Sequence, residues 1–376
     1  MKLRTFFCIL LSIILITAFP LNCRASTRVD TLSISAKSAI LIDLDEKNII
    51  YQKNAKERMP MASTTKIVTA LVVCELLPCD ATVKITNEAV GVEGSSVYLQ
   101  EGELLTVEEL LYALLLESAN DAAVALAVCA SGSIENFANK CNEMAYTLGL
   151  RDTNFTNPHG LYDENHYTTA YDLAILSAEA LKNPTIKKIC ATKRAEISLG
   201  VTDSLPTGSG KRYLKNHNKM LSAYDGAIGV KTGFTKKSGR CLVSAAERDG
   251  LTLITVTLNA PDDWRDHTEM LDFGFKNFEK RIIFSQGEFR YSFPISNAQA
   301  ESVTLTNLSP ITVVTEKSTP MHTYSVESCF RFAIAPIQQG QIVGKLCVNL
   351  NGKNYTSTLV SAESIDAKQE KHSFFN

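Results

Sequence analysis

The sequence lacks several features that would point to particular classes of protein. Among its ten cysteines no two form a CxxC pair, so zinc ribbons and thioredoxin-like redox chemistry are unsupported. Its 38 basic and 40 acidic residues give a net charge of −2, so no basic field is available to attract nucleic acid. With 45% hydrophobic residues in a chain of 376, the composition is that of a globular protein, and a small-molecule or neutral-polymer substrate fits it better than nucleic acid.

The sequence does not establish whether the cysteines are free thiols or form disulfides. Cys74, Cys129 and Cys241 interrupt apolar segments, so we expect them to be buried as small hydrophobic side chains. Exported proteins usually oxidise their cysteines, which implies that some pair or that the organism lives where thiols stay reduced. The sequence does not decide between these two cases.

The amino terminus has no apolar run as long as a membrane-spanning helix. Its apolar run, residues 6–19, is shorter than the roughly 20 residues that a spanning helix needs. Lys2 and Arg4 precede this run, and small residues suited to cleavage follow up to Ala25. We therefore predict a signal peptide over residues 1–25, with an uncleaved anchor as the alternative, and an exported protein of the cell wall or the outer face of the cytoplasmic membrane.

The first part of the remaining chain is predicted to be mostly helical. Residues 38–52 hold two apolar runs around a polar turn, which predicts a β-hairpin. Apolar residues at helical spacing follow between Pro60 and Pro78, so a helix is expected there. Thr106 and Glu109 then form a T-x-x-E capping box ahead of long apolar helical runs.

The pattern changes to short β-rich runs from about residue 226. The hairpin dipeptide Asp249-Gly250 separates two of these runs, so an antiparallel sheet is expected, which the amino-terminal hairpin can join and the helices can cover. A last helix is predicted over residues 267–281, and strand-like segments follow. We therefore predict an α+β fold with these parts: a first domain over residues 26–283, a small all-β sandwich domain over residues 284–361, and a short polar tail over residues 362–376.

Three short motifs occur once each and in one order. They are S-x-x-K at Ser63 to Lys66, S-x-N at Ser118 to Asn120, and K-T-G at Lys231 to Gly233. Each is weak alone, because a pattern with two fixed residues is expected about once by chance in a chain of this length. Their order and settings carry the weight: a helix start, a break between two apolar helical runs, and an edge-type strand.

The first motif suits nucleophilic catalysis. Positions i and i+3 lie on one face of a helix, so the Lys66 amine can reach the Ser63 hydroxyl. A serine needs an adjacent base, and a lysine serves only if burial, the helix dipole or a neighbouring cation such as Lys231 lowers its pKa. The alternative is that Ser63 merely caps the helix and Lys66 is solvated.

The other two motifs suit the binding of a substrate. Ser118 and Asn120 form a polar island between apolar runs, where polar groups must find partners; a capped loop between helices is the alternative. Lys231 and Thr232 on a strand could hold a carboxylate, and Gly233 would let a substrate backbone approach closely. The alternative is an exposed edge strand that a lysine protects.

Taken together, these residues resemble the active site of the penicillin-recognising serine acyl-transferases. More narrowly, the chain resembles the low-molecular-mass penicillin-binding proteins, the serine-type D-alanyl-D-alanine carboxypeptidases. The resemblance covers nearly everything after the signal and includes "MASTTKIVTALV", "LLESANDAAVALA", "TNPHGLYDENHYTTAYDLA", "DGAIGVKTGFTKKSGRCLVSAAERDG" and "APIQQGQIVGKLCVNLNGK". It implies a β-lactamase/transpeptidase-like first domain, with the all-β domain after it.

The resemblance also implies roles for the motif residues. Ser63 would attack the penultimate D-alanine carbonyl of a peptidoglycan stem peptide and form an acyl-enzyme, with Lys66 as proton acceptor. Ser118, together with Lys231, would relay a proton to the leaving amine. Asn120 would hydrogen-bond the substrate's backbone amide, and β-lactams would acylate Ser63 and stay attached.

Further positions follow from the same resemblance. Thr232 would bind the terminal carboxylate, helped by Arg265, and the backbone N–H groups of Ser63 and Phe234 would form the oxyanion hole. No cofactor and no metal is implied, because His159 and His166 lack a zinc-helix spacing and more readily fix loop structure. The loop over residues 87–100 would border the site.

Three other functions compete with this one. An endopeptidase that cuts peptidoglycan crosslinks could use the same residues with a wider cleft. A β-lactamase shares the motifs but would not carry the extra β domain, and a non-catalytic wall-binding protein is disfavoured by the intact motifs. The family often ends in an amphipathic helix that lies on the membrane, whereas the tail offers only Ile365, Phe374 and Phe375, so a peripheral membrane contact stays open.

Overall fold

The computed structural model describes residues 32–200, 210–319, 324–330, 333–350 and 352–368. The signal peptide predicted over residues 1–25 lies outside these residues, as does the end of the polar tail. The account below concerns the compact unit that begins at Ile34. No helix in the described ranges is both long and apolar enough to cross a membrane.

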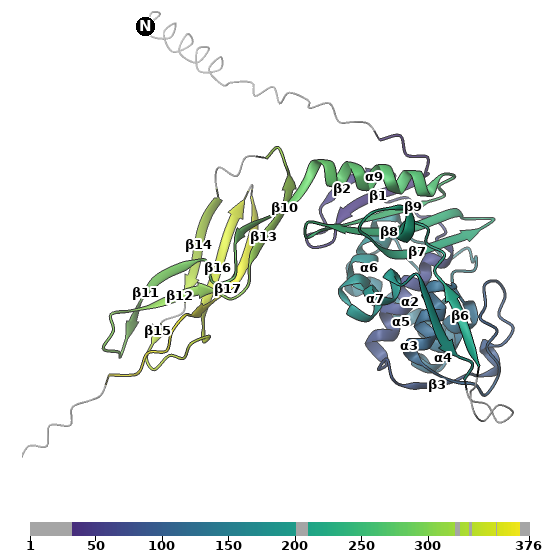
Figure 1. Cartoon of the computed structure of the whole chain (residues 1–376), viewed down its shortest axis with the longest axis horizontal. Coiled ribbons are helices and arrows are strands. Elements are labelled where there is room, and N and C mark those ends of the chain that lie inside the picture. The colour runs from purple at the N-terminus through teal and green to yellow at the C-terminus, as the bar shows by residue number, and fades with distance from the viewer. Residues whose placement is uncertain (1–31, 201–209, 320–323, 331–332, 351, 369–376) are drawn as a thin grey trace, which may run out of the picture. The chain divides into compact units, whose positions relative to one another are not determined.

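A five-stranded antiparallel sheet forms the centre of the first part of this unit (Figure 1). The predicted hairpin is confirmed and joins the sheet, because its first strand pairs with the last strand of the later β region. The dipeptide Asp249-Gly250 forms the tight turn that was expected, with φ of 50° and 76°. The sheet has the order β2 (Ile49–Lys53), β1 (Ser38–Asp43), β9 (Leu251–Leu258), β8 (Gly239–Arg248) and β7 (Ala227–Thr235), which leaves the K-T-G strand at an edge.

Helices cover both faces of this sheet. Helix α9 (Asp263–Asn277) packs on β8 and β9, and Figure 1 shows it on the side of the sheet opposite to α6 (Ala170–Lys182), which packs on β1 and β9. A helical region whose core is continuous with the sheet lies beyond α6. The helical elements are η1 (Ala62–Thr65), α2 (Lys66–Leu76), η2 (Asn87–Ala89), α3 (Val107–Leu116), α4 (Asn120–Ser131), α5 (Ile134–Thr147), α6 (Ala170–Lys182), α7 (Pro184–Ala191), α8 (Met220–Ala223) and α9 (Asp263–Asn277).

Local sequence signals account for several of these boundaries. The capping box predicted at Thr106 and Glu109 is present at the start of α3, where each residue bonds the other's backbone N–H. Helices α3 and α4 separate at the predicted polar break. Two short hairpins flank the helices: β3 (Thr82–Lys84) with β4 (Leu104–Thr106), and β5 (Arg194–Ser198) with β6 (Lys211–Lys215).

Two sequence predictions are wrong in this part. The last helix was expected over residues 267–281, but α9 is Asp263–Asn277, and the residues after it form strand β10 (Phe278–Phe284), because they pair with β13 (Ile311–Glu316). Cys129 is exposed rather than buried, because it lies in the last turn of α4, whereas Cys241 is buried as expected and Cys74 is half-buried. No cysteine is disulfide-bonded among the seven that the structure describes.

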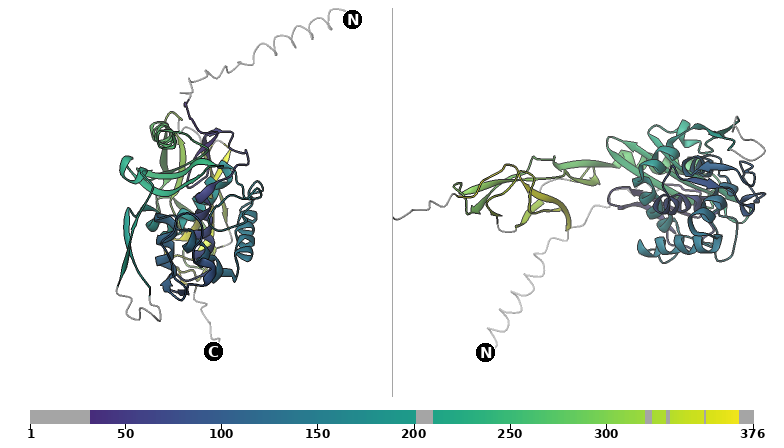
Figure 2. Two further views of the ribbon diagram at one scale, coloured as in Figure 1. Left: turned by 90° about the vertical axis from the view of Figure 1, so that its right-hand side faces the viewer. Right: turned by 90° about the horizontal axis from the view of Figure 1, so that it is seen from below.

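The carboxy-terminal part is β-rich, which confirms the predicted class of this region (Figures 1 and 2). Alternating side chains such as Val303, Leu305, Leu346 and Val348 point inward and form its small cores. Its six-stranded sheet has the order β14 (Tyr324–Phe330), β16 (Ile342–Leu350), β17 (Lys353–Ser361), β12 (Ser302–Asn307), β11 (Arg290–Ser296) and β15 (Ala333–Ile334). The exact domain boundaries stay predictions.

Candidate active site

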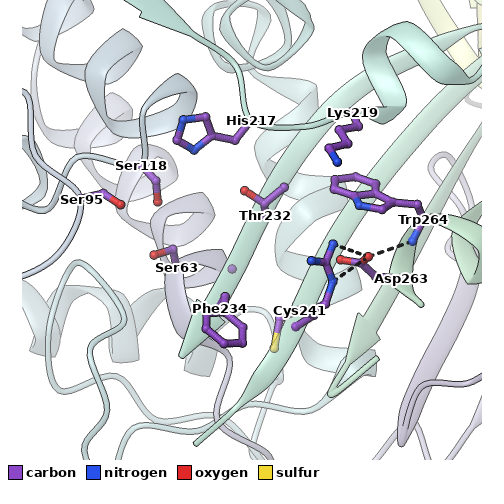
Figure 3. Close-up of a pocket in the computed structure, with 12 residues that line it drawn as sticks. Ser63, Ser95, Ser118, His217, Lys219, Thr232, Phe234, Cys241, Asp263 and Trp264 are labelled. Carbon is purple, nitrogen blue, oxygen red and sulfur yellow. Dashed lines mark hydrogen bonds and ion pairs between the residues drawn. The ribbon is translucent and has the colours of Figure 1, made fainter. Parts of the chain in front are cut away.

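The fold brings the three motifs together at one cleft of about 360 Å³ (Figure 3). Ser63 from η1, Ser118 from the break between α3 and α4, and Thr232 and Phe234 from β7 all line this cleft. Figure 3 shows the two serines on one side and the β7 residues facing them. Residues that lie far apart in the sequence therefore share one solvent-accessible space.

Ser63 does not cap a helix. It lies inside the one-turn helix η1, and neither η1 nor α2 has a side-chain hydrogen bond at its N-cap. Its Oγ instead lies 3.1 Å from the Nζ of Lys66, one turn further along the chain. The capping alternative is therefore wrong, and the serine–lysine pair that the spacing predicted is present.

The hydrogen bonds of Lys66 determine what its amine can do. The side chain is fully buried, and its Nζ lies 2.7 Å from the Asn120 Oδ1 and 2.7 Å from the His159 carbonyl oxygen, in addition to Ser63 Oγ. The amide and carbonyl oxygens can only accept hydrogen bonds, so they take the two hydrogens of a neutral amine. The lone pair is then left for the Ser63 hydroxyl, which can donate. This arrangement suits a lysine that accepts a proton from serine.

Electrostatics favour the same neutral form. Burial, and then the charge of Lys231, hold the pKa of Lys66 well below its usual value. Lys231 is itself 1% exposed, and burial lowers its pKa to about 8. Two lysines buried in one site cannot both carry a charge without cost, so Lys66 is the one expected to be neutral.

A strained backbone segment presents Ser63 to the cleft. Ala62, which precedes the serine, has φ of +48°, a conformation that a non-glycine residue adopts only when its surroundings enforce it. Gly160 provides the contact: it has φ of +87°, and a Cβ built on it would lie 2.0 Å from the Ala62 carbonyl oxygen. Only glycine fits between the loop and the serine turn at this point.

His166 ties the same loop to the turn that carries the serine. Its Nδ1 accepts a hydrogen bond from the Thr156 backbone N–H, at 3.0 Å, so the other ring nitrogen carries the hydrogen. That nitrogen, Nε2, donates to Thr65 Oγ1 at 2.8 Å. Burial lowers the pKa of His166 to about 4, so the ring is neutral at ordinary pH. The predicted loop-fixing role of this histidine is confirmed.

The polar island of Ser118 and Asn120 lies at the predicted break between two helices, and Asn120 also contacts Lys66, which the sequence did not indicate. Ser118, with φ of +60°, lines the cleft, whereas Asn120 is 4% exposed and uses both ends of its amide within the protein. Its Oδ1 accepts from Lys66, and its Nδ2 donates to the Glu93 carbonyl oxygen at 2.5 Å. Asn120 is therefore held as a positioning residue for Lys66, and its contact with a substrate amide stays a prediction.

Asp121, which the sequence did not single out, anchors the loop beside the cleft. Its buried carboxylate accepts hydrogen bonds from the Ser96 hydroxyl at 2.6 Å and from the backbone N–H groups of Val97 and Leu99, both at 3.1 Å. Ser95, in the same loop, lines the cleft. The loop over residues 87–100 thus borders the site, as expected.

Gly233 lets the K-T-G strand approach the serine turn. A Cβ on this residue would lie 3.0 Å from the Ser63 backbone nitrogen and 3.1 Å from that of Thr64, so a side chain would push β7 away from η1. This close approach brings the backbone of Gly233 next to that of Ser63. The pair of backbone donors that would form an oxyanion hole, Ser63 and Phe234, stays a prediction.

The wall of the cleft beyond β7 consists of residues that no motif identified. Trp264 lies there with Arg240, whose Nε and Nη2 lie 3.0 and 2.6 Å from Asp263 Oδ1. His217 and Lys219, which precede α8, complete this wall. No spacing rule marks these residues, because they come from separate segments that only the folded sheet brings together.

Arg265 does not line the cleft, although the resemblance suggested that it grips the substrate. Its guanidinium is exposed and lies 3.2 Å from Asp262, 3.8 Å from Asp266 and 3.6 Å from Glu269. Three carboxylates of its own helical segment therefore surround it. Its role in binding stays a prediction that this position does not support.

Comparisons with known proteins all indicate the same family. The chain matches the family of D-alanyl-D-alanine carboxypeptidases over residues 25–262. It is 34% identical, over 89% of its length, to the D-alanyl-D-alanine carboxypeptidase DacF of Bacillus subtilis, of which it covers 87%.

Solved structures are similar as well. Penicillin binding protein 5 of Haemophilus influenzae superposes with a TM-score of 0.67 at 26% identity, over 89% of this chain and 98% of that protein. A peptidoglycan synthesis regulatory factor, PBP3, of Streptococcus pneumoniae superposes with a TM-score of 0.75 at 26% identity, over 89% and 100%. The chain therefore belongs to the D-alanyl-D-alanine carboxypeptidases, serine peptidases that act on peptides ending in D-alanyl-D-alanine.

Proposed function

We propose that the protein removes the terminal D-alanine from peptidoglycan stem peptides through an acyl-enzyme on Ser63. The observation that carries this proposal is the environment of Lys66: burial favours its neutral form, and in that form its two hydrogens go to acceptor-only neighbours, so the lone pair is left for the Ser63 hydroxyl. A serine is a poor nucleophile until a base of this kind takes its proton.

In the acylation step, Ser63 Oγ attacks the carbonyl carbon of the penultimate D-alanine as its proton passes to Lys66 Nζ. The carbonyl oxygen becomes an oxyanion that the backbone N–H groups of Ser63 and Phe234 stabilise. The C–N bond then breaks, and the proton on Lys66 passes through the Ser118 hydroxyl to the leaving amine. Free D-alanine departs, and an ester remains on the serine.

In the deacylation step, water attacks the ester carbonyl and gives up a proton to the neutral Lys66. The C–O bond to Ser63 breaks, the serine oxygen regains a proton from Lys66, and the shortened peptide leaves with a new carboxyl group that loses its remaining proton to solvent. Lys231 stabilises the anionic groups of the site as a buried cation, and Thr232 hydrogen-bonds the substrate's terminal carboxylate.

The same acylation step applies to β-lactams. A β-lactam presents a strained amide to Ser63, and its opening leaves an acyl group that has no departing amine.

Because peptidoglycan lies outside the cytoplasmic membrane, the protein would work as an exported enzyme, which the apolar run near its amino terminus supports.

The direct test is the release of D-alanine from a synthetic peptide ending in D-Ala-D-Ala. The wild-type protein should release one D-alanine for each peptide, whereas Ser63→Ala, which removes only the hydroxyl, should release none while it unfolds at the same temperature. Absence of release by a folded wild-type protein would overturn the proposal.

An endopeptidase activity is tested on isolated peptidoglycan. Mass analysis of the products distinguishes the loss of one alanine from the loss of a crosslink. We expect the loss of one alanine.

A further inference from the structure

The segment between β6 and α8 presents two basic side chains to the cleft. His217 and Lys219 are exposed and line the cleft, whereas Asn218 between them is 3% exposed. Asn218 fixes this alternation of exposed and buried side chains. Its backbone N–H donates to Asn216 Oδ1 at 2.9 Å, and its own Oδ1 accepts from the Met220 N–H at 3.0 Å. A hydrogen-bonded turn therefore holds the two basic side chains on the side of the cleft.

Of the three basic side chains that line the cleft, Lys219 differs in its surroundings. Arg240 is hydrogen-bonded to Asp263, and His217 Nε2 lies 3.2 Å from a carboxylate oxygen of Glu117. Lys219 has no carboxylate within ion-pair distance among the residues that the structure describes. It is thus the cleft cation that is available to an anion from outside.

The anion that would enter this part of the cleft is the carboxylate of the substrate. In the view of Figure 3, Lys219 and Trp264 lie beyond Thr232 as seen from Ser63 and Ser118. If Thr232 binds the terminal carboxylate, as expected, a cation beyond Thr232 meets that carboxylate on the side away from Ser63. The cation that the resemblance assigned to this carboxylate, Arg265, lies outside the cleft among carboxylates of its own.

We propose that Lys219 is a specificity-determining residue that pairs with the free α-carboxylate of the terminal D-alanine. The inference rests on the proposed function. An end whose carboxyl group is amidated carries no charge at this position, so it gains nothing from the ammonium group. Lys219 accordingly directs the enzyme toward peptides with a free terminal carboxylate and away from amidated ends.

The test compares two peptides that differ only at the carboxyl terminus. One ends in D-Ala-D-Ala with a free carboxylate, and the other ends in D-Ala-D-Ala amide. Lys219→Gln should lower kcat/KM for the acid by about fivefold, mainly through KM, because an exposed ion pair is of modest strength. The same variant should leave kcat/KM for the amide unchanged. Raising the salt concentration should weaken cleavage of the acid by the wild type and not by the variant.

Lys215→Gln is the matched control, because it removes an exposed lysine of β6 that does not line the cleft. It should behave as the wild type on both peptides. An equal loss on the acid and the amide, or no loss on either, with Lys219→Gln would overturn the assignment of Lys219. Failure of the wild type to release D-alanine from the acid would instead overturn the proposed function, so the two failures are distinguishable.

Discussion

At the scale of single residues, the site is explained by which groups can donate hydrogen bonds. Lys66 has two neighbours that only accept and one, Ser63, that can also donate. In a neutral Lys66 this asymmetry leaves the lone pair facing the Ser63 hydroxyl, whereas an ammonium group would donate to all three neighbours, so the lowered pKa of Lys66 is what makes it the proton acceptor. The charge of the K-T-G lysine, Lys231, also lowers the pKa of Lys66, so the protonation of the two lysines is linked.

The pH dependence of kcat/KM tests this linkage. Activity requires neutral Lys66, so it should rise with pH through the pKa of Lys66, which burial and Lys231 place well below the usual lysine value of about 10.4. It should fall again as the pH rises through about 8, where Lys231 loses its proton. The measurement is a pH–rate profile with the D-Ala-D-Ala peptide.

Lys231→Met removes the charge that depresses the pKa of Lys66. The rising limb of the residual activity should therefore move to higher pH in this variant. A rising limb at the wild-type position would contradict the proposed electrostatic link between the two lysines.

At the scale of elements, the catalytic serine depends on contacts between a loop and a one-turn helix. Gly160 packs on Ala62, and His166 bonds Thr65, so the loop that contains both fixes the serine turn. Gly233 separately lets β7 lie against η1. The serine is thus held by two segments that both need glycine at the contact.

Gly160→Ala should displace the serine turn. The new methyl group would overlap the Ala62 carbonyl oxygen, and a shift of about 1 Å in a reacting group can lower kcat about a hundredfold. The control is Gly149→Ala, because Gly149 also has positive φ, +78°, but has open space around its Cα. The control should lose about 1 kcal/mol of stability and keep its kcat. Kinetics and urea unfolding of both variants measure the two effects, and equal kinetics would argue against a positioning role for Gly160.

The helices and strands also show which structural features could be predicted from the sequence alone. The helix start at Ser63 and the capping box at Thr106 could be predicted, because each depends on neighbours within a few residues. Strand β10 could not, because its pairing with β13 overrides a local helical pattern. The contact of Gly160 with Ala62 and the cleft position of Lys219 join distant segments, so no local spacing encodes them.

At the scale of the whole molecule, buried polar groups join the helices to the sheet. His267 of α9 is fully buried, with Nδ1 2.7 Å from Thr255 Oγ1 and Nε2 2.9 Å from Thr257 Oγ1, both on β9. Burial lowers the pKa of this histidine to about 3. The folded protein therefore keeps the ring neutral at pH values where the unfolded chain protonates it.

Acid should consequently destabilise the fold through His267. A folded pKa below the unfolded value of about 6.5 means that the unfolded state binds more protons, so stability is full above pH 6.5 and falls as the pH falls toward 3. Between pH 7 and pH 5 this group should cost about 2 kcal/mol. Urea unfolding at the two pH values should show a smaller difference for His267→Gln than for the wild type, by about that amount. The same difference in both proteins would mean that His267 is not the group responsible.

The central claim is that Ser63 is the residue that becomes acylated. The most direct measurement is incubation of the protein with benzylpenicillin, followed by proteolysis and mass analysis of the peptides. The account predicts a persistent adduct of one penicillin on the peptide that contains Ser63, and no adduct in Ser63→Ala. An adduct on another residue, or rapid turnover of penicillin without a persistent adduct, would contradict it.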